Sequence, residues 1–249
     1  MHLYFRICCS VLIDLKPKTV VSNPKILYII PARGGSKGVP DKNIKLLSGK
    51  PLIYYSIVEA LKVASKEDVC VSTDSEKIKA VVEEIGLEVP FLRPDEIASD
   101  TATTESVLIH ALNYYKSKGI EYEFVVLLQP TSPLRKAIHI KEAIELMEED
   151  VNLVVSVKET DANPYYVLFQ ENETGILEKS KKGVFTRRQD CPIVYELNGA
   201  VYVIRTSKLL ELGYQKLQMK KYLMPKRASI DIDDLIDFKI AEVLMKEVG

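Results

Sequence analysis

The sequence predicts an α/β protein with a doubly wound, mostly parallel sheet, and three observations predict it. Short apolar runs of strand length alternate with segments of helical periodicity through the first two thirds of the chain, a pattern typical of parallel sheets covered by helices on both faces. The 249 residues, 47% of them hydrophobic and 28% charged, have the composition of a globular protein rather than of a coiled coil or a disordered chain. A chain of this length can bury one large core without disulfides.

The expected strands are continuous apolar runs, which suit strands that are covered on both faces. The first is Ile26 to Ile30, which stops at Pro31, and the others are expected at 68–73, 88–92, 124–128, 153–157 and 200–204. Apolar residues at helical spacing predict helices over 51–64, 75–85, 103–118, 138–149 and 233–246.

The helical period disappears between about residues 158 and 196. Turn signals such as Asn163-Pro164 and Lys181-Lys182-Gly183 separate short segments rich in tyrosine, valine and phenylalanine there, so we expect a β-rich insertion built of hairpins. Residues 1–24 show no such regular pattern, and we expect a loosely ordered N-terminal extension followed by one domain over 25–249.

The charge balance excludes a protein whose whole surface attracts polyanions. Lysine plus arginine number 34 and aspartate plus glutamate 35, a formal net charge of -1, so we expect neither nucleic-acid nor membrane binding. Any phosphate recognition must then come from a local site. The four cysteines show no CxxC spacing, which favours a reducing compartment, and we expect a cytoplasmic protein.

The strongest candidate for chemistry is the loop directly after the first strand. In an open parallel sheet, ligands bind outside the carboxyl ends of the strands, where such loops gather. Glycines allow the backbone to approach a ligand closely and basic side chains supply positive charge, a combination that suits a polyphosphate; the alternative is a solvated basic loop. The candidate nucleotide-binding residues of this loop are Ala32, Arg33, Gly34, Ser36, Lys37, Lys42 and Asn43.

Asp231 and Asp233 are two residues apart on an expected short strand, so both side chains should point to one face. Two carboxylates on one face repel each other unless a cation lies between them, and Mg²⁺ favours one or two carboxylates together with substrate phosphate oxygens. The alternative is that Asp233 or Asp234 is the N-cap of the last helix. One aspartate could do either job while its neighbour does the other.

Two further polar loops follow expected strands. Residues 129–135 bring an amide, two hydroxyls and the Arg135 guanidinium to the sheet edge that carries Arg33, and two prolines stiffen this loop; the alternative is an ordinary strand-to-helix connection. Arg93 follows the expected strand at 88–92 and can give a planar bidentate contact to a phosphate or a base edge.

Together these segments resemble the acylneuraminate cytidylyltransferases, the synthetases of CMP-sialic acid and of related CMP-nonulosonic acids. The resemblance runs from Lys25 to the last helix and leaves out only residues 1–24. Its motifs are Ile30-Pro31-Ala32-Arg33-Gly34-Gly35-Ser36-Lys37-Gly38 with Lys42-Asn43, Arg93-Pro94 with Ala98-Ser99-Asp100-Thr101, Leu128 to Arg135, Asn198-Gly199-Ala200, and Ser229 to Asp233.

The resemblance implies a Rossmann-like nucleotidyltransferase fold and a Mg²⁺-dependent enzyme. The implied reaction transfers CMP from CTP to the anomeric hydroxyl of a nine-carbon 2-keto sugar acid and releases pyrophosphate. Such an attack on the α-phosphorus needs the triphosphate held in line with its charge offset, so positioning and electrostatics would supply most of the catalysis.

Site roles carry over by motif position. The resemblance implies catalytic roles for Arg33 and Lys42, which would contact the phosphates, and for Asp231 and Asp233, which would hold Mg²⁺. The residues that would fix the cytidine are Asn43, Arg93 and Thr104, and those that would bind the sugar acid are Gln129 and Asn198.

The resemblance also implies a homodimer in which the insertion at about 158–196 lines the partner's sugar site. Arg187 and Arg188 would meet the sugar carboxylate, and Tyr165 and Phe185 suit an interface; the alternative is an exposed hairpin with charged turns. Because the insertion is the family's variable part, N-acetylneuraminic, legionaminic and pseudaminic acid all stay open as substrates, with the insertion slightly nearer to the first two types.

Two rival functions also stay open. A CMP-Kdo synthetase would share the reaction and the broad fold, although we expect a different loop after the first strand in that family. A non-catalytic nucleotide- or sugar-binding homologue would have lost the chemistry, whereas every matched polar position here holds a competent residue. The double variant Asp231→Ala with Asp233→Ala separates an enzyme from a binding homologue, because it should abolish Mg²⁺-dependent turnover in the enzyme and change little in the binding homologue.

Overall fold

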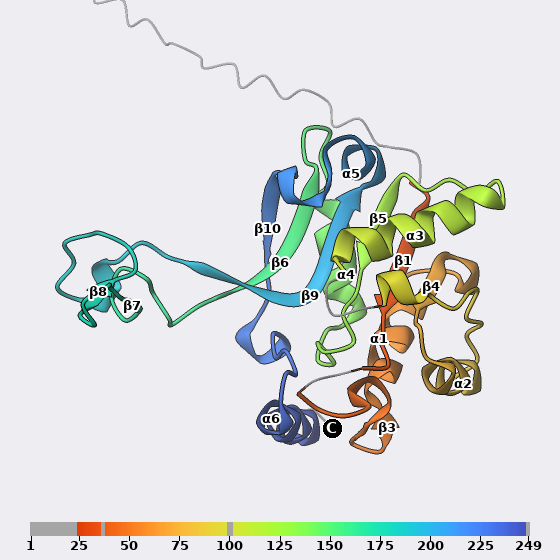
Figure 1. Cartoon of the computed structure of the whole chain (residues 1–249), viewed down its shortest axis with the longest axis horizontal. Helices are drawn as coiled ribbons and strands as arrows, with labels where there is room; N and C mark the ends of the chain where they lie inside the picture. The colour runs from red at the N-terminus through yellow and green to blue at the C-terminus, as the bar shows by residue number, and fades with distance from the viewer. Residues whose placement is uncertain (1–23, 36–37, 99–101, 248–249) are drawn as a thin grey trace, which may run out of the picture.

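The computed structural model describes residues 24–35, 38–98 and 102–247. Its centre is a six-stranded sheet in the order β10-β6-β9-β5-β1-β4 (Figure 1). Neighbouring strands are parallel except at β9, which runs antiparallel to β5 and to β6. The predicted doubly wound, mostly parallel sheet is therefore confirmed. The strands are β1 (Ile26–Pro31), β4 (Val69–Ser72), β5 (Phe124–Leu127), β6 (Leu153–Glu159), β9 (Tyr195–Arg205) and β10 (Met219–Leu223).

Alternate residues of the central strands pack against helices on opposite faces. Tyr28 and Ile30 of β1 belong to the core shared with α1, α2 and α4, whereas Leu27 and Ile29 belong to the core shared with α3 and α5. A third, smaller core joins α6 to β2 and the start of α1. The helices are α1 (Leu52–Leu61), α2 (Glu76–Glu84), α3 (Thr104–Ser117), α4 (Ala137–Glu145), α5 (Thr206–Leu212) and α6 (Leu235–Lys246).

Side-chain caps fix where three of these helices begin. Ser75, Thr103 and Asp234 each accept a hydrogen bond from a backbone N–H in the following turn, as N-cap residues do. None of the helices that the structure describes has both the length and the apolar character needed to cross a membrane. The expected cytoplasmic location stays a prediction, and most of the expected extension at 1–24 lies outside the described residues.

Two predicted strands were wrong. Residues 88–92, which the structure describes in full, form no strand, and a single bridge joins Leu92 to Thr73. Pro90 has no backbone N–H to donate to a strand ladder, which disfavours a strand here. Residues 229–233 are also irregular, and the backbone N–H of Ile232 bonds to the carbonyl of Thr131 in a loop instead of to a strand.

Other elements differ in extent or were not predicted. The helix expected over 138–149 ends at Glu145. Neither α5 nor β10 was predicted, because α5 is short and β10, at the edge of the sheet, interrupts its apolar residues with two lysines. The hairpin of β2 (Leu46–Leu47) and β3 (Lys50–Pro51) was missed for the same reason, since each strand has only two residues.

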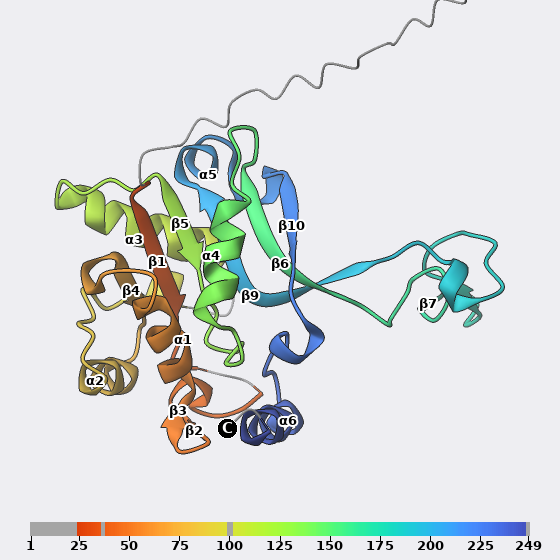
Figure 2. The ribbon, with the colours of Figure 1, turned by 180° about the vertical axis from the view of Figure 1, so that it is seen from behind.

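A hairpin extension leaves the body where β6 and β9 continue beyond the sheet as a paired stalk. Lys158 pairs with Glu196 and Glu159 with Tyr195 in this stalk. The tip carries the antiparallel strands β7 (Phe169–Glu171) and β8 (Leu177–Lys179). Figures 1 and 2 show that the tip lies far from the sheet and its helices, so the predicted hairpin insertion is confirmed as a separate unit of structure.

Candidate active site

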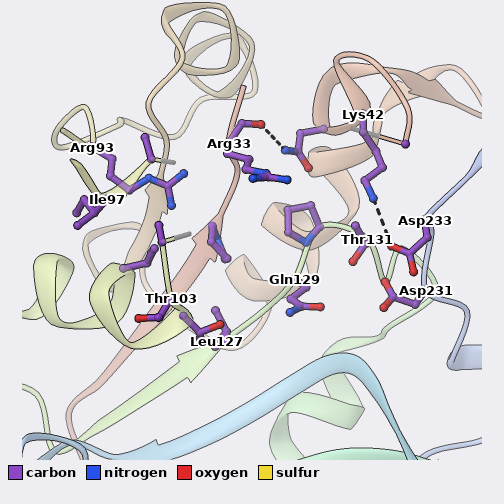
Figure 3. A pocket seen from close by; sticks show the side chains of 18 residues that line it. Arg33, Lys42, Arg93, Ile97, Thr103, Leu127, Gln129, Thr131, Asp231 and Asp233 are labelled. Atoms are coloured by element: carbon purple, nitrogen blue, oxygen red, sulfur yellow. Dashed lines mark hydrogen bonds and ion pairs between the residues drawn. The ribbon is translucent and has the colours of Figure 1, made fainter. Parts of the chain in front are cut away.

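A pocket of about 690 Å³ lies at the carboxyl ends of β1 and β5. Its walls come from the loop after β1, the segment after Leu92, the start of α3, the loop after β5 and the segment before α6 (Figure 3). Eight of the predicted site residues line it together: Arg33, Lys42, Asn43, Arg93, Thr104, Gln129, Asp231 and Asp233. The fold thus gathers most of the candidates that were distant in the sequence.

The loop after β1 is held at both of its ends. The backbone N–H of Ala32 donates to the Ser72 carbonyl at 2.9 Å, and Nδ2 of Asn43 donates to the Arg33 carbonyl at 3.0 Å. At Gly38 a Cβ would lie 2.5 Å from the Asp233 carbonyl oxygen, so only glycine fits there. Ala32 is buried below the pocket and does not line it, nor does Gly34, whereas the predicted residues Ser36 and Lys37 lie outside the described part of the chain.

Lys42 joins this loop to the acidic segment before α6. Its Nζ donates to the Ile232 carbonyl at 2.6 Å and lies 3.7 Å from Oδ1 of Asp233. The lysine side chain is 14% exposed and the aspartate 85% exposed, so this ion pair is open to solvent on the carboxylate side. Figure 3 shows Lys42 and Arg33 facing the same cavity as the two carboxylates.

Asp231 is half-buried beside Asp233. One of its oxygens, Oδ1, is buried and has no hydrogen-bond partner within the described residues. Burial raises the pKa of Asp231 and the charge of Asp233 raises it further, while a hydrogen bond from Thr131 and the charge of Lys42 oppose the rise. A half-buried carboxylate with an unmatched oxygen is costly unless it binds a proton or a cation.

Asp234 decides which aspartate caps the last helix and which ones remain available to a metal ion. Its side chain accepts from Ile236 at 2.7 Å and from Asp237 at 3.0 Å, so Asp234 is the cap of α6. Asp231 and Asp233 both line the pocket. The expected strand, which would place them on one face, is not formed. Nowhere in the described ranges do three or more His, Cys, Asp or Glu side chains gather closely enough to hold a metal alone. Two carboxylates suit Mg²⁺ if substrate oxygens complete its ligands.

Arg93 lies on the side of the pocket opposite Asp231 and Asp233 (Figure 3). Its side chain is 5% exposed and pairs with Asp74 at 3.4 Å, while its buried Nε has no partner in the part of the chain that the structure describes. Desolvation lowers the pKa of Arg93, and Asp74 opposes that effect. A buried guanidinium with an unmatched N–H suits a phosphate or a carbonyl oxygen.

The pocket also has an apolar wall that the sequence did not reveal as part of a site. Ile97, Val107 and Leu127 line it next to Thr104. Val107 and Leu127 sit at positions that hydrophobic periodicity assigns to the core, so no local signal distinguishes them from ordinary packing residues.

Gln129 and Asp231 approach each other across a glycine. A Cβ on Gly199 would lie 2.5 Å from Oε1 of Gln129 and 3.2 Å from Oδ2 of Asp231. Gly199 also has φ +71°, a conformation that L side chains rarely adopt. The glycine in the predicted Asn198-Gly199-Ala200 motif therefore leaves room for two polar side chains of the site.

Two polar residues of the predicted motifs are in the core instead of in the pocket. Asn198 is 1% exposed, and its amide bonds with Ser156, Ser229 and the backbone of Ala200. The expectation that the Arg135 guanidinium lies at the sheet edge beside Arg33 is corrected: Arg135 is 1% exposed and donates to the carbonyls of Gln129 and Ala200. Neither lines the pocket, and sugar binding by Asn198 stays a prediction.

Arg187 and Arg188 lie on the hairpin extension, away from the pocket of their own chain (Figure 1). Arg187 pairs with Asp190 at 2.9 Å, and Arg188 pairs with Asp161. Tyr165 and Phe185 contact each other edge to face at 5.5 Å between ring centroids. None of these four residues lines the pocket of their own chain.

Known proteins similar to this chain share one activity class. The profile of a family described as cytidylyltransferase matches residues 27–245. A CMP-N,N'-diacetyllegionaminic acid synthase of Legionella pneumophila is 36% identical over 230 residues, which is 89% of this chain and 97% of that protein. An N-acylneuraminate cytidylyltransferase of Streptococcus agalactiae is 40% identical over 220 residues, 86% of this chain but 52% of that protein.

Two more distant comparisons agree. A pseudaminic acid cytidylyltransferase of Campylobacter jejuni is 32% identical over 224 residues, 89% of this chain and 97% of that protein. The solved structure of a CMP:2-keto-3-deoxy-manno-octonic acid synthetase complexed with CTP matches with a TM-score of 0.67 and covers 90% of this chain and 100% of that one. At 17% identity, this second likeness shows the shared fold alone.

Proposed function

Because the chain belongs to the cytidylyltransferase family, we propose that it transfers CMP from CTP to the anomeric hydroxyl of a nonulosonic acid and releases pyrophosphate. One observation carries the proposal: a pocket at the carboxyl ends of β1 and β5 in which Arg33, Lys42 and Arg93 face Asp231 and Asp233. Its volume is within the usual range for a bound small molecule. Relatives of this chain are named for legionaminic, N-acylneuraminic and pseudaminic acid.

The cationic side of the pocket suits the nucleotide. Arg33 and Lys42 come from the loop after β1 and can offset the charge of a triphosphate, including that of the leaving pyrophosphate. Arg93 and Asn43 offer N–H donors, and Thr104 a hydroxyl, for the cytidine. The apolar wall beside Thr104 suits a base or ribose face, since ligand pockets combine apolar walls with a few polar groups.

Gln129 offers its amide to the sugar acid on the other side of the pocket, next to Asp231. In the reaction, the anomeric oxygen forms a bond to the α-phosphorus, and the bond from that phosphorus to the bridging oxygen of pyrophosphate breaks. Holding both substrates in line supplies most of the acceleration that such a site can give. Gly199 supports this arrangement because it leaves the space in which Gln129 and Asp231 meet.

The unmatched oxygen of Asp231 supports a bound Mg²⁺ at the same place. Asp231 and Asp233 would hold the ion, and Lys42 lies 3.7 Å from Asp233, where it can keep that carboxylate oriented. A bound Mg²⁺ would offset phosphate charge during the transfer.

The hairpin extension supports a homodimer as part of the proposal. Four of its apolar side chains are more than 60% exposed: Ile176, Leu177, Val184 and Ile193. Exposed apolar surface of this kind is typical of an interface. In such a dimer Arg187 and Arg188 would meet the carboxylate of the sugar acid in the partner's pocket.

The experiment is pyrophosphate release from CTP and Mg²⁺ with N-acetylneuraminic, legionaminic, pseudaminic and 2-keto-3-deoxy-octonic acids in parallel, each with and without EDTA. We expect metal-dependent release with one of the nine-carbon acids. The double variant Asp231→Ala with Asp233→Ala should release none while it still folds. Release only with the eight-carbon acid would favour the rival synthetase, and CTP binding without turnover for any acid would favour a non-catalytic homologue.

A further inference from the structure

Asp74 lies between two of the loops that line the pocket, although no sequence motif pointed to it. It follows β4, whose last residue is Ser72. The carbonyl of the intervening Thr73 accepts the backbone N–H of Arg93 at 2.7 Å. The end of β4 therefore bonds both to the loop after β1, where Ala32 donates to the Ser72 carbonyl at 2.9 Å, and to the segment that carries Arg93.

One carboxylate oxygen of Asp74 serves both loops. Oδ1 accepts the backbone N–H of Gly34 at 3.0 Å and the guanidinium of Arg93 at 3.4 Å. A Cβ on Gly34 would make a tight contact at 3.0 Å with Cβ of Ser75. The Asp74 side chain is 20% exposed, so these bonds are only partly screened by water.

A carboxylate this close to the proposed triphosphate site would repel the substrate if no cation offset its charge. The negative charge of Asp74 pairs with the buried Arg93. Burial disfavours the charged form of Arg93, and Asp74 opposes that effect. A hydrogen bond between two charged groups is about twice as strong as a neutral one and is directional. Asp74 is thus well placed to hold the guanidinium in the pocket and in register with the loop after β1.

We infer that Asp74 is a positioning residue for the nucleotide, which acts by fixing Arg93 and the Gly34 backbone relative to each other. This inference rests on the proposed function, because it assumes that the pocket binds CTP. It concerns only the nucleotide half of the site, since Gln129, Asp231 and Asp233 make none of the described contacts with Asp74.

The test compares Asp74→Ala and Asp74→Asn with the wild-type chain. We expect Asp74→Ala to weaken CTP binding, measured by calorimetry, by about 10- to 100-fold, the loss that a charge-assisted hydrogen bond predicts. Asp74→Asn should lose less, because its amide oxygen can still accept from Gly34. The KM for the sugar acid at saturating CTP should stay within about twofold of the wild-type value. A general packing defect would instead weaken the binding of both substrates.

Glu76→Ala is the matched control, because Glu76 is an acidic residue two positions along, is exposed and pairs only weakly with Lys79 at 3.9 Å. It should bind CTP like the wild-type chain. A cycle with Arg93→Ala adds a second readout: the loss caused by Asp74→Ala should shrink several-fold when Arg93 is already absent, because the two residues act together.

The inference is overturned, while the proposed function stands, by wild-type affinity for CTP in Asp74→Ala or by an equal loss with and without Arg93. An equal rise of KM for both substrates also overturns it, because that is the signature of a structural role. A wild-type chain that binds no CTP overturns the proposed function and this inference with it.

Discussion

Burial makes the charge of Asp231 costly, yet the proposed chemistry needs that charge. Burial raises the pKa of this carboxyl, so the folded protein binds a proton there more tightly than the unfolded chain does. The stability contributed by this group is therefore fully present at low pH and is lost as pH rises through the folded pKa. At neutral pH, without a bound cation, the ionised carboxylate should therefore lower the stability of the folded protein.

We predict that Asp231→Asn raises the melting temperature at neutral pH in EDTA, because it removes a half-buried charge, and that it abolishes pyrophosphate release. Thermal unfolding across a pH series checks the first part. The difference from wild type should shrink as pH falls below about 3, where the carboxyl is mostly protonated in both states.

Asp233→Asn is the control for this effect. Its carboxylate is 85% exposed, so the substitution should change the melting temperature little while it still reduces turnover. A melting temperature that falls in Asp231→Asn would contradict the assigned cause.

Gly199 and Gly49 make a matched pair for a second prediction at this scale. Both have positive φ, +71° and +82°, but a Cβ meets Gln129 and Asp231 only at Gly199, whereas nothing lies within 4 Å of one at Gly49. Alanine at either position should cost about 1 kcal/mol of stability. Only Gly199→Ala should lower kcat/KM, by about 10-fold or more, a loss of at least ~1.4 kcal/mol in transition-state stabilisation.

Denaturant unfolding and steady-state kinetics on both variants check this. Equal activity in the two variants would show that the space beside Gly199 is not used by the reaction.

At the scale of elements, the loop after β5 is held by a guanidinium in the core. Arg135 donates to the Gln129 carbonyl at 3.1 Å, to the Ala200 carbonyl at 2.9 Å and to the Ser56 hydroxyl at 2.5 Å. Desolvation lowers the pKa of Arg135 to about 10, so the side chain stays charged at neutral pH. It thereby joins α1, β9 and the loop that presents Gln129.

We predict that Arg135→Met lowers the free energy of unfolding by about 2–5 kcal/mol, because it removes three hydrogen bonds of a buried guanidinium and leaves the Gln129 carbonyl with longer ones, such as that from the Ser56 hydroxyl at 3.3 Å. Arg135→Lys should recover little, since an ammonium lacks the planar fork of donors. Urea titration measures both.

Arg205→Met is the control for this loss. Arg205 also donates to two backbone carbonyls, but it is 18% exposed and lies next to β5 at the end opposite the pocket. It should cost less stability and leave turnover intact. If Arg205→Met lowered the free energy of unfolding as much as Arg135→Met does, the loss at Arg135 could not be attributed to its place in the core.

At the scale of the whole molecule, the pocket and the extension are separate parts of one chain. The two are joined by the stalk of β6 and β9, and at the outer end of this stalk the N–H of Thr160 donates to the Val194 carbonyl at 3.1 Å. The extension can therefore be removed without breaking the sheet.

We predict that replacing residues 161–193 by Asn-Gly, a turn that suits antiparallel strands, converts a dimer into a monomer. Light scattering after gel filtration measures the mass. CTP affinity should stay within about threefold, because every residue proposed to bind the nucleotide lies outside the extension, whereas turnover should be lost with the partner's arginines.

The full-length variant Lys182→Ala is the control, because Lys182 is exposed, and it should stay dimeric and active. A truncated chain that still turns over would show that the site is complete within one protomer.

The sequence by itself determined the fold class, the hairpin insertion, the family and most of the pocket. Strand and helix periods are local properties, and the loop after β1 and the Asp231 segment hold their chemistry within a few residues. It also placed Lys42 and Asp233 as candidates, which the structure brings to 3.7 Å.

Only the tertiary structure decided which polar side chains reach the pocket. Arg135 and Asn198 look like ligand-binding residues in the sequence but are 1% exposed, whereas Asp74 looks ordinary and connects two loops of the site. Asp234, not Asp233, caps α6. The reason is physical: a polar residue either binds a ligand or satisfies buried backbone groups, and which it does depends on what packs against it from distant parts of the chain.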